Sequence, residues 1–238
     1  MPRLLLAFTI AMIMATSASA QRNRGLAYPP KMDGARVEVY KTIGDVKLNV
    51  YIFTPEGHGP TDKAPAIVFF FGGGWKSGSP TQFLQHCKYL ASRGIVAMTA
   101  DYRVLSRHGT KAVKCVADGK SAVRWIRPNA EQDAIDPDPI ASGGGSAGAH
   151  EAACTGTISG FDEQGEDTEI SSLRNAMVVF IPASVLAPAV HQEELPDRCL
   201  SGLGERMGVE PKKLSPFHHV YQGAPRNKIL LGSGDTTV

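Results

Sequence analysis

The sequence predicts an α/β fold in which a mostly parallel central sheet carries helices on both faces and begins with an antiparallel hairpin. Three observations predict this fold: two alternating segments near the N-terminus, one continuous apolar run after them, and a repeated alternation of strands and helices from there on. The chain has 238 residues, of which 42% are hydrophobic and 20% charged. This is enough for one large domain with a well-buried core.

The two alternating segments predict the hairpin. Val37–Tyr40 alternates between apolar and polar residues, and Val46–Phe53 alternates more clearly. Gly44-Asp45 between them suits a tight turn. The next strand is Ala66–Phe71, and its lack of alternation indicates a central strand that is buried on both sides.

After this run, strands and helices alternate in the manner of right-handed crossovers. The expected elements are the helices Pro80–Arg93, Lys111–Arg127 and Ala147–Thr157, and the strands Ile95–Thr99, Pro139–Ser142, Ala176–Ile181 (buried) and Ile229–Leu231. Two polar stretches, Ser159–Thr168 and Pro188–Pro211, fit neither pattern. Long loops of this kind carry binding sites or are surface elaborations, and the sequence leaves both open.

The first 20 residues are typical of a secretory signal peptide. Arg3 supplies the positive charge, Leu4–Met14 is an apolar run too short to span a bilayer, and Ala18-Ser19-Ala20 suits a cleavage site. We therefore expect cleavage between Ala20 and Gln21 and a periplasmic or secreted protein. No later segment is apolar and long enough to cross a membrane.

The mature chain reads as an extended leader over residues 21–36 and one domain over residues 37–238. The net charge of +2 and the absence of a lysine or arginine cluster give no sign of a nucleic-acid partner. The cysteines match no zinc motif, and neither their disulfide state nor the oligomeric state can be read from the sequence. They are Cys87, Cys115 and Cys154, which fall on expected helices where a buried free thiol is the simplest interpretation, and Cys199.

The run Ser142–Gly148 contains the pattern Gly144-x-Ser146-x-Gly148 between an expected strand and an expected helix. In a nucleophile elbow the chain turns sharply at a serine, and glycines stand on both sides because side chains there would clash. The serine hydroxyl then stands clear of the sheet at the start of the helix. Ser146 is therefore the candidate nucleophile.

A second glycine-rich motif, Phe71-Gly72-Gly73-Gly74-Trp75, directly follows the buried strand. An oxyanion hole needs backbone N–H groups that no side chain obstructs. A glycine triplet at the end of a central strand offers such groups, so this segment is the candidate oxyanion loop.

These motifs, in this order, resemble the α/β-hydrolases of the esterase and lipase type, and in particular secreted bacterial esterases of the group with feruloyl- and acetylxylan-esterase-like domains. The resemblance covers roughly residues 37–238 and includes Asp101-Tyr102-Arg103, Ala117–Ala122, Trp125–Arg127, Ile135–Pro137, Gly144–His150 and Ile229–Val238. It implies the α/β-hydrolase fold and a serine-dependent hydrolase of carboxylic esters that works through an acyl-enzyme. A small-molecule or carbohydrate ester, such as an acetyl or feruloyl ester, would be the substrate, with no metal or other cofactor.

By the resemblance, Ser146 is the nucleophile, the amides of Gly73, Gly74 and Ala147 form the oxyanion hole, and Asp235 orients the catalytic histidine. Phe71 replaces the histidine that usually opens the glycine motif, at a position with a supporting role. The family order is serine, aspartate, histidine. The histidine is therefore expected about 30 residues after Asp235, beyond Val238. The sequence thus reads as C-terminally incomplete, without the last helix.

The histidines that are present have other expected roles. His150 lies on the elbow helix below the serine, and His218 and His219 look like a structural or capping pair. Three aspartates, Asp101, Asp118 and Asp136, are expected to serve as hydrogen-bonding scaffold. Two other functions stay open: a serine peptidase of the same fold, and an inactive, truncated hydrolase-fold protein that only binds ligand.

Overall fold

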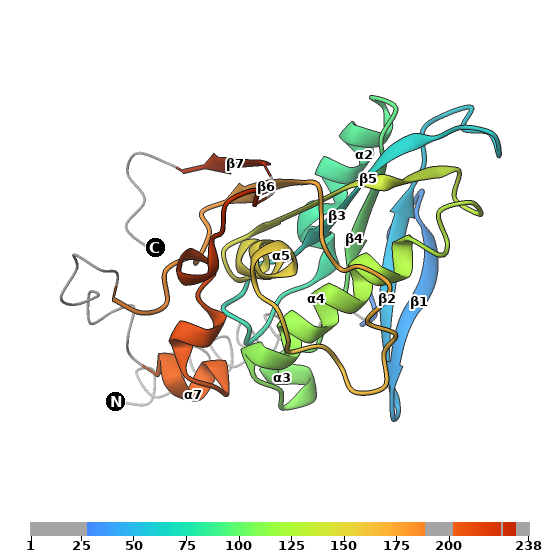
Figure 1. Ribbon diagram of the computed structural model, residues 1–238. Helices are drawn as coiled ribbons and strands as arrows, with labels where there is room; N and C mark the ends of the chain where they lie inside the picture. The colour runs from blue at the N-terminus through green and yellow to red at the C-terminus, as the bar shows by residue number, and fades with distance from the viewer. Residues whose placement is uncertain (1–27, 189–201, 225, 232–238) are drawn as a thin grey trace, which may run out of the picture. The chain divides into compact units, whose positions relative to one another are not determined.

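The computed structural model describes residues 28–188, 202–224 and 226–231 of the chain. The predicted signal peptide, residues 21–27 of the predicted leader, Cys199 and Asp235 lie outside the described residues. From Met32 onward the chain forms one compact unit. Its strands are β1 (Arg36–Ile43), β2 (Val46–Phe53), β3 (Ala64–Phe70), β4 (Val96–Ala100), β5 (Ile135–Gly145), β6 (Ala176–Phe180) and β7 (Arg226–Leu230) (Figure 1). Its helices are η1 (Pro80–Phe83), α2 (Leu84–Ala91), α3 (Leu105–His108), α4 (Ala112–Ile126), α5 (Ala147–Thr157), α7 (Leu203–Met207), η2 (Pro211–Leu214) and η3 (Pro216–His219).

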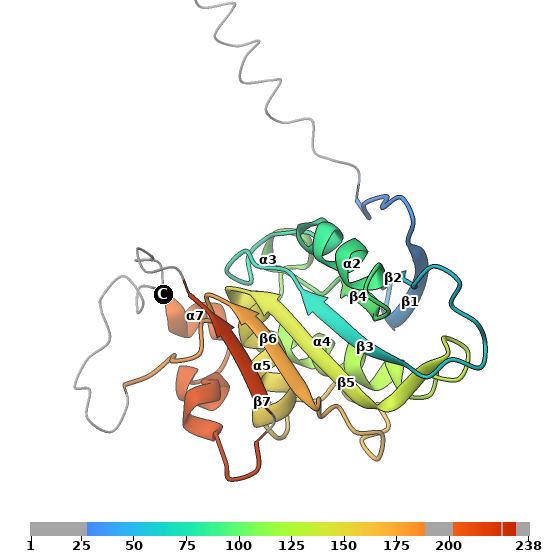
Figure 2. The same cartoon turned by 90° about the horizontal axis from the view of Figure 1, so that it is seen from above.

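The seven strands form one sheet in the order β1-β2-β4-β3-β5-β6-β7. The hairpin strands β1 and β2 are antiparallel, as predicted, and β2 also pairs antiparallel with β4. The strands from β4 to β7 are parallel to one another. Figure 2 shows β3, β5, β6 and β7 side by side with their arrowheads at one edge of the sheet. Loops that leave this edge therefore meet, which brings the two glycine motifs together.

The continuous apolar run of β3 is buried on both faces, as its composition predicted. Ile67 and Phe69 join a cluster that includes α2, with Phe83 and Cys87, whereas Val68 and Phe70 join the larger cluster formed with α4 and α5. Helices thus cover both faces of the sheet, and β3 supplies side chains to each.

The last two strands are less buried than the sequence suggested. In β6 only Val179 is fully buried, and all five residues of β7 are exposed. The strand β7 also lies earlier in the chain than predicted, over Arg226–Leu230 instead of Ile229–Leu231. Among the described strands β7 is the last in the sheet, so β6 is its one neighbour there. The apolar residues of these two segments therefore suggested more burial than the structure shows.

Several helix boundaries differ from the sequence prediction for local reasons. The segment predicted as one helix from Pro80 begins as a 3₁₀ turn, which is capped by the Ser79 side chain, and becomes α-helical at Leu84. The helix α7 lies within the stretch Pro188–Pro211, which had been interpreted as non-helical. It has only five residues between Gly202 and Gly208, both with positive φ angles. A helix this short produces too little periodicity to be recognised.

The acidic stretch Ser159–Thr168 folds against α4 and β1 through ion pairs. Glu163 pairs with Lys41 at 3.1 Å and with Lys114 at 2.9 Å. Asp162 pairs with Arg124 at 2.5 Å and with Lys120 at 3.5 Å. This stretch is therefore a structural strap across α4.

The structure agrees with one further prediction. Cys87, Cys115 and Cys154 are buried free thiols. Among the described residues, no helix combines the length and the apolar character that a membrane span requires.

Candidate active site

Ser146 lies at the turn between β5 and α5 and has a backbone conformation that side chains rarely adopt. Its φ is 51° and its ψ is −116°. A positive φ at a non-glycine residue stores strain, which surrounding contacts must offset, and such residues cluster at functional sites. The Ser146 N–H donates to the Phe180 carbonyl of β6 at 3.0 Å, and the Ser146 carbonyl accepts the first helical bond, from His150. The serine is half-buried.

Both glycines of the motif are required by close backbone contacts. A Cβ on Gly148 would lie 2.1 Å from the Phe70 carbonyl oxygen of β3. A Cβ on Gly144 would lie 2.4 Å from the backbone of Gly148. These atoms belong to rigid elements, so they cannot move aside. For steric reasons this turn therefore requires glycine two residues before Ser146 and two residues after it.

The glycine triplet after β3 lies directly against this turn. A Cβ on Gly72 would lie 3.4 Å from the Ser146 Cβ and 2.8 Å from the Gly145 carbonyl oxygen. The Gly72 N–H donates to the Gln82 side chain at 2.5 Å, which fixes the start of the loop. Gly73 and Gly74 have φ angles of 138° and 63°. A branched side chain at either position would be strained, so the loop needs glycine.

Three backbone N–H groups near Ser146 are available to a ligand. Among the described residues, no hydrogen bond engages the amides of Gly73 and Gly74. Ala147 is the first residue of α5, where helical geometry leaves the N–H without an internal partner. The positive end of the helix dipole adds to the attraction for negative charge. These are the amides that the sequence predicted for an oxyanion hole.

Phe71, which replaces the histidine expected from the resemblance, packs inside the fold. Its ring stacks on Tyr102 with centroids 4.0 Å apart, and the Tyr102 hydroxyl donates to the Phe71 carbonyl at 2.5 Å. It also supports the far end of the loop, since a Cβ on Gly78 would clash with its ring. Phe71 thus holds the glycine loop by packing.

His150 is locked beneath Ser146 and is not placed to act as a base. The Trp75 indole N–H donates to its Nδ1 at 3.3 Å, so Nε2 carries the proton and donates to the Leu214 carbonyl at 2.7 Å. Complete burial lowers the pKa of His150 to about 4. A neutral imidazole with both nitrogens engaged anchors Trp75 and the η2 segment to α5.

The other predicted residues have structural partners. His218 contacts Ser215 and the Pro188 carbonyl, and His219 contacts the Lys212 carbonyl. Within the described part of the chain, no histidine side chain hydrogen-bonds to the Ser146 hydroxyl, and no group of three or more His, Cys, Asp or Glu could hold a metal ion. The predicted acid, Asp235, lies outside the described residues.

The predicted aspartate scaffold centres on Asp118 of α4. Its carboxylate accepts two hydrogen bonds at 2.8 Å from the Arg103 guanidinium and one at 3.0 Å from the Arg103 amide. Lys41 of β1 lies 2.9 Å away on the same carboxylate. Asp101 accepts from the Tyr102 amide at 2.8 Å. Asp101 also pairs with Arg107 of α3 at 3.3 Å, so it and Asp118 hold elements together, as expected. Asp136 accepts from the Asp138 amide at 3.1 Å, a contact within β5.

Sequence reasoning missed Glu151, which follows His150 on the elbow helix. Its side chain is fully buried, and neither carboxyl oxygen has a hydrogen-bond partner. Burial, together with the nearby Asp118 and Asp101 charges, raises its pKa well above the usual value. Burial therefore favours the protonated, neutral form of this carboxyl group. A glutamate inside an alanine-rich helix gives no sign of burial in the sequence.

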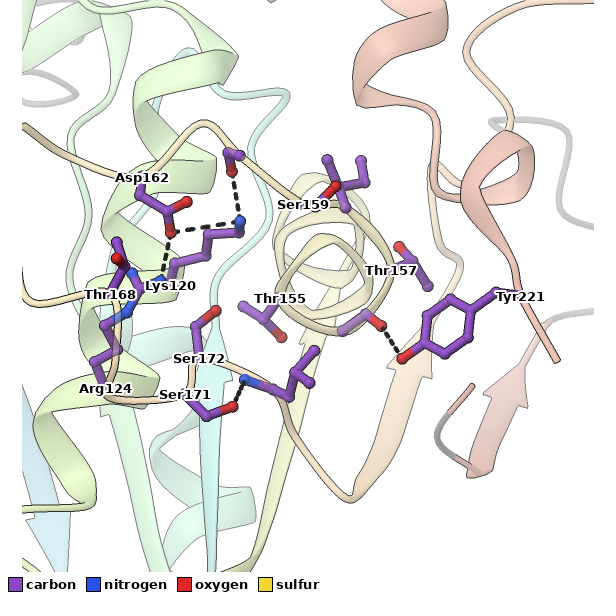
Figure 3. Close-up of a pocket in the computed structure, with 14 residues that line it drawn as sticks. Lys120, Arg124, Thr155, Thr157, Ser159, Asp162, Thr168, Ser171, Ser172 and Tyr221 are labelled. Carbon is purple, nitrogen blue, oxygen red and sulfur yellow. Dashed lines mark hydrogen bonds and ion pairs between the residues drawn. The ribbon is translucent and has the colours of Figure 1, made fainter. Parts of the chain in front are cut away.

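A cavity of about 520 Å³ lies at the opposite end of α5 from Ser146. It is lined by Thr155 and Thr157 of α5, by Tyr221 and by basic residues of α4 (Figure 3). Lys120 and Arg124 both turn toward Asp162, so their charges are already compensated. This cavity is separate from the serine turn.

A strained serine between a parallel strand and a helix, with a glycine loop from the neighbouring strand beside it, defines the α/β-hydrolase class. The comparisons with known proteins agree. The BD-FAE family model matches residues 50–238, so the chain belongs to the BD-FAE family, an esterase family of α/β-hydrolases.

Solved structures of one esterase are similar over most of the chain. Esterase 2 of Thermogutta terrifontis, phosphonylated by sarin, is 48% identical, with 90% of this chain and 78% of that chain covered and a TM-score of 0.86. Its butyrate-bound form gives the same identity and a TM-score of 0.83, with 90% and 77% covered.

Curated relatives match over shorter segments. Esterase LipC of Mycobacterium tuberculosis is 32% identical over 121 residues, which is 48% of this chain and 30% of the relative. Carboxylesterase NlhH of the same organism is 30% identical over 138 residues, which is 56% of this chain and 41% of the relative. The match thus spans less than half the length of these curated relatives.

Proposed function

We propose that this protein is a serine-dependent carboxylic-ester hydrolase. The observation that carries the proposal is the conformation of Ser146, which is strained at a turn where no bulkier sequence could fold. The Ser146 oxygen attacks the ester carbonyl, the alcohol leaves, and water releases the acid from the acyl-enzyme. The amides of Gly73, Gly74 and Ala147 stabilise the negative oxygen of the tetrahedral intermediate.

The proton transfers need a histidine. We place this base after Asp235, in the chain order serine, aspartate, histidine of this class, with Asp235 as the acid that orients it. The locked geometry and lowered pKa of His150 support this placement, because they leave His150 unable to take the proton.

Short-chain esters are the proposed substrates, because the similar Thermogutta terrifontis esterase is described with butyrate and propionate bound. The family resemblance extends the proposal to acetyl or feruloyl esters of carbohydrates. We also propose that the protein acts in the periplasm or outside the cell after cleavage of a signal peptide between Ala20 and Gln21, because its first 20 residues have the charge, the apolar run and the small residues of such a peptide.

The test is the turnover of an aryl acetate by a protein that includes the expected histidine, and by its Ser146→Ala variant. Loss of the nucleophile should lower kcat/KM by about 10³-fold or more. Ser142→Ala is the matched control, because Ser142 is a buried serine of the same strand whose hydroxyl only donates to the Ala152 carbonyl. Turnover that survives in Ser146→Ala would contradict the assignment, and Ser142→Ala should keep the activity of the unmodified protein.

A second measurement identifies the attacked residue directly. Paraoxon should form a phosphoryl ester on the peptide that contains Ser146 and release one equivalent of 4-nitrophenolate; the similar esterase is described as phosphorylated by paraoxon. Faster cleavage of an aminoacyl anilide than of the aryl acetate would instead favour a peptidase. A folded chain that binds esters but shows neither adduct nor turnover would favour a binding protein.

A further inference from the structure

We infer that this site prefers esters that carry a negatively charged group, and that a cavity beside the glycine loop holds this group. The inference rests on the proposed function and specifies its substrate class. The cavity has a volume of about 570 Å³ and is lined by Trp75, the residue directly after Gly74. It therefore adjoins the loop that would hold the ester carbonyl.

The cavity lies between three elements at the carboxyl edge of the sheet. The Trp75 carbonyl accepts from the Leu105 amide at 3.1 Å, and the Lys76 carbonyl accepts from the Ser106 amide at 2.8 Å. These bonds fix α3 to the glycine loop. On the inner side, the Trp75 ring meets His150 edge-on at 5.1 Å, one turn after Ser146. Trp75, which forms this side of the cavity, thus packs against α5, the helix that begins directly after Ser146.

The charge of the lining is unbalanced. Lys76 and Lys111 both line the cavity, and among the described residues neither has an ion pair. Lys41, Lys114 and Lys120, by contrast, all pair with carboxylates. Two uncompensated ammonium groups in a concave site focus a positive potential and concentrate anions there.

The remaining lining suits an anion on a short apolar linker. Glu205 is the acidic residue of the lining, and it pairs with neither lysine. The Thr110 hydroxyl is a buried oxygen without a hydrogen-bond partner, so it is free to donate to an anion. Trp75 and Leu105 supply an apolar wall.

The test compares esters that differ only in charge. 4-Nitrophenyl hydrogen succinate and 4-nitrophenyl butyrate have the same leaving group and a four-carbon acyl chain, and only the first carries a carboxylate. 4-Carboxyphenyl acetate and phenyl acetate place the charge on the alcohol instead. We expect kcat/KM to favour the anionic member of at least one pair, and the preference to shrink as salt screens the charges.

Lysine variants of the full chain then test the source of the preference. Lys76→Gln and Lys111→Gln should each lower the ratio of anionic to neutral kcat/KM about threefold, and the double variant about tenfold. Lys63→Gln is the matched control, because Lys63 is also exposed and lies before β3, at the opposite end of that strand from Lys76. Its ratio should equal that of the unmodified protein.

The outcomes separate the two proposals. Suppose that neutral esters are hydrolysed, but neither salt nor the double variant changes the ratio of anionic to neutral kcat/KM. This result overturns the anion preference and leaves the esterase function intact. No hydrolysis of any ester by a protein that includes the expected histidine overturns the esterase function. In that case, titration of the Trp125→Phe chain with monomethyl succinate still tests the cavity through Trp75 emission. A response that persists after both lysines are replaced rejects the cavity as the site.

Discussion

The cores that pack on the two faces of the sheet differ in composition. Against α2 the core consists of aromatic and aliphatic groups, such as Phe69 and Phe83, whose rings stack at 4.7 Å. Against α4 and α5 a larger apolar core surrounds buried ionisable groups: Asp118 with its partners, His150 and Glu151. The face that carries the nucleophile is therefore the one whose stability depends on charge.

This difference has a physical origin in the chain connections. The glycine loop, α3 and the acidic strap all cross the α4 and α5 side, and their polar backbone and side-chain groups need partners there. The core on the α2 face, by contrast, mainly excludes water. We therefore expect the first face to respond to charge and pH, and the second to respond only to volume.

The largest effect on stability should come from Asp118→Asn. The change leaves Lys41 and the Arg103 guanidinium with a weakened partner in a site where their side chains are less than a tenth exposed. Breaking a buried ion pair from one side costs about 3–5 kcal/mol of unfolding free energy. Urea unfolding measures this cost.

The control for Asp118→Asn is Asp138→Asn, since Asp138 is exposed. It should change the unfolding free energy by less than about 0.5 kcal/mol. Equal effects of the two substitutions would show that the buried network does not distinguish this face.

A somewhat smaller effect should appear in the pH dependence of unfolding. The pKa of His150 falls to about 4 on folding, so below pH 6.5 the unfolded state takes up a proton that the folded state refuses. Stability is lost as the pH falls from 6.5 to 4, by about 3 kcal/mol in total. Below pH 4 this contribution stays constant.

Glu151 acts in the opposite direction. Its pKa is raised on folding, so above pH 4.5 the unfolded state releases a proton that the folded state keeps, and stability falls as the pH rises. Glu151→Gln removes this contribution. The variant should therefore gain stability relative to the unmodified protein as the pH rises above 4.5 toward the raised pKa of Glu151, by up to about 1.4 kcal/mol per pH unit. Parallel pH profiles for the two proteins would contradict a buried neutral Glu151.

The smallest effect belongs to the α2 face. Cys87→Ala removes a fully buried sulfur from α2 and should cost about 1 kcal/mol through lost burial and packing. Burial raises the pKa of the Cys87 thiol to about 12, so the cost should be the same at pH 5 and pH 8. A pH-dependent cost would mean that charge matters on this face as well.

Much of the site could be predicted because its constraints are local. The positions of Gly144 and Gly148 follow from clashes within one strand–turn–helix unit, and α5 spans the predicted residues Ala147–Thr157. The hairpin and the buried strand β3 also follow from local alternation or its absence. Boundaries were less certain where a single residue decides them, as at Ser79, whose side-chain cap starts a 3₁₀ turn.

The sequence by itself determined the strand and helix pattern, the candidate nucleophile Ser146 and the need for glycine around it, because steric rules act between near neighbours along the chain. Only the tertiary structure decided which polar groups are buried and with what partners. Asp118 meets Lys41 across 77 positions of sequence, and His150 meets Trp75 and Leu214 from three separate elements. The cavity with Lys76 and Lys111 likewise exists only where the glycine loop, α3 and α7 come together. Such contacts depend on how distant elements pack, and no local pattern encodes them.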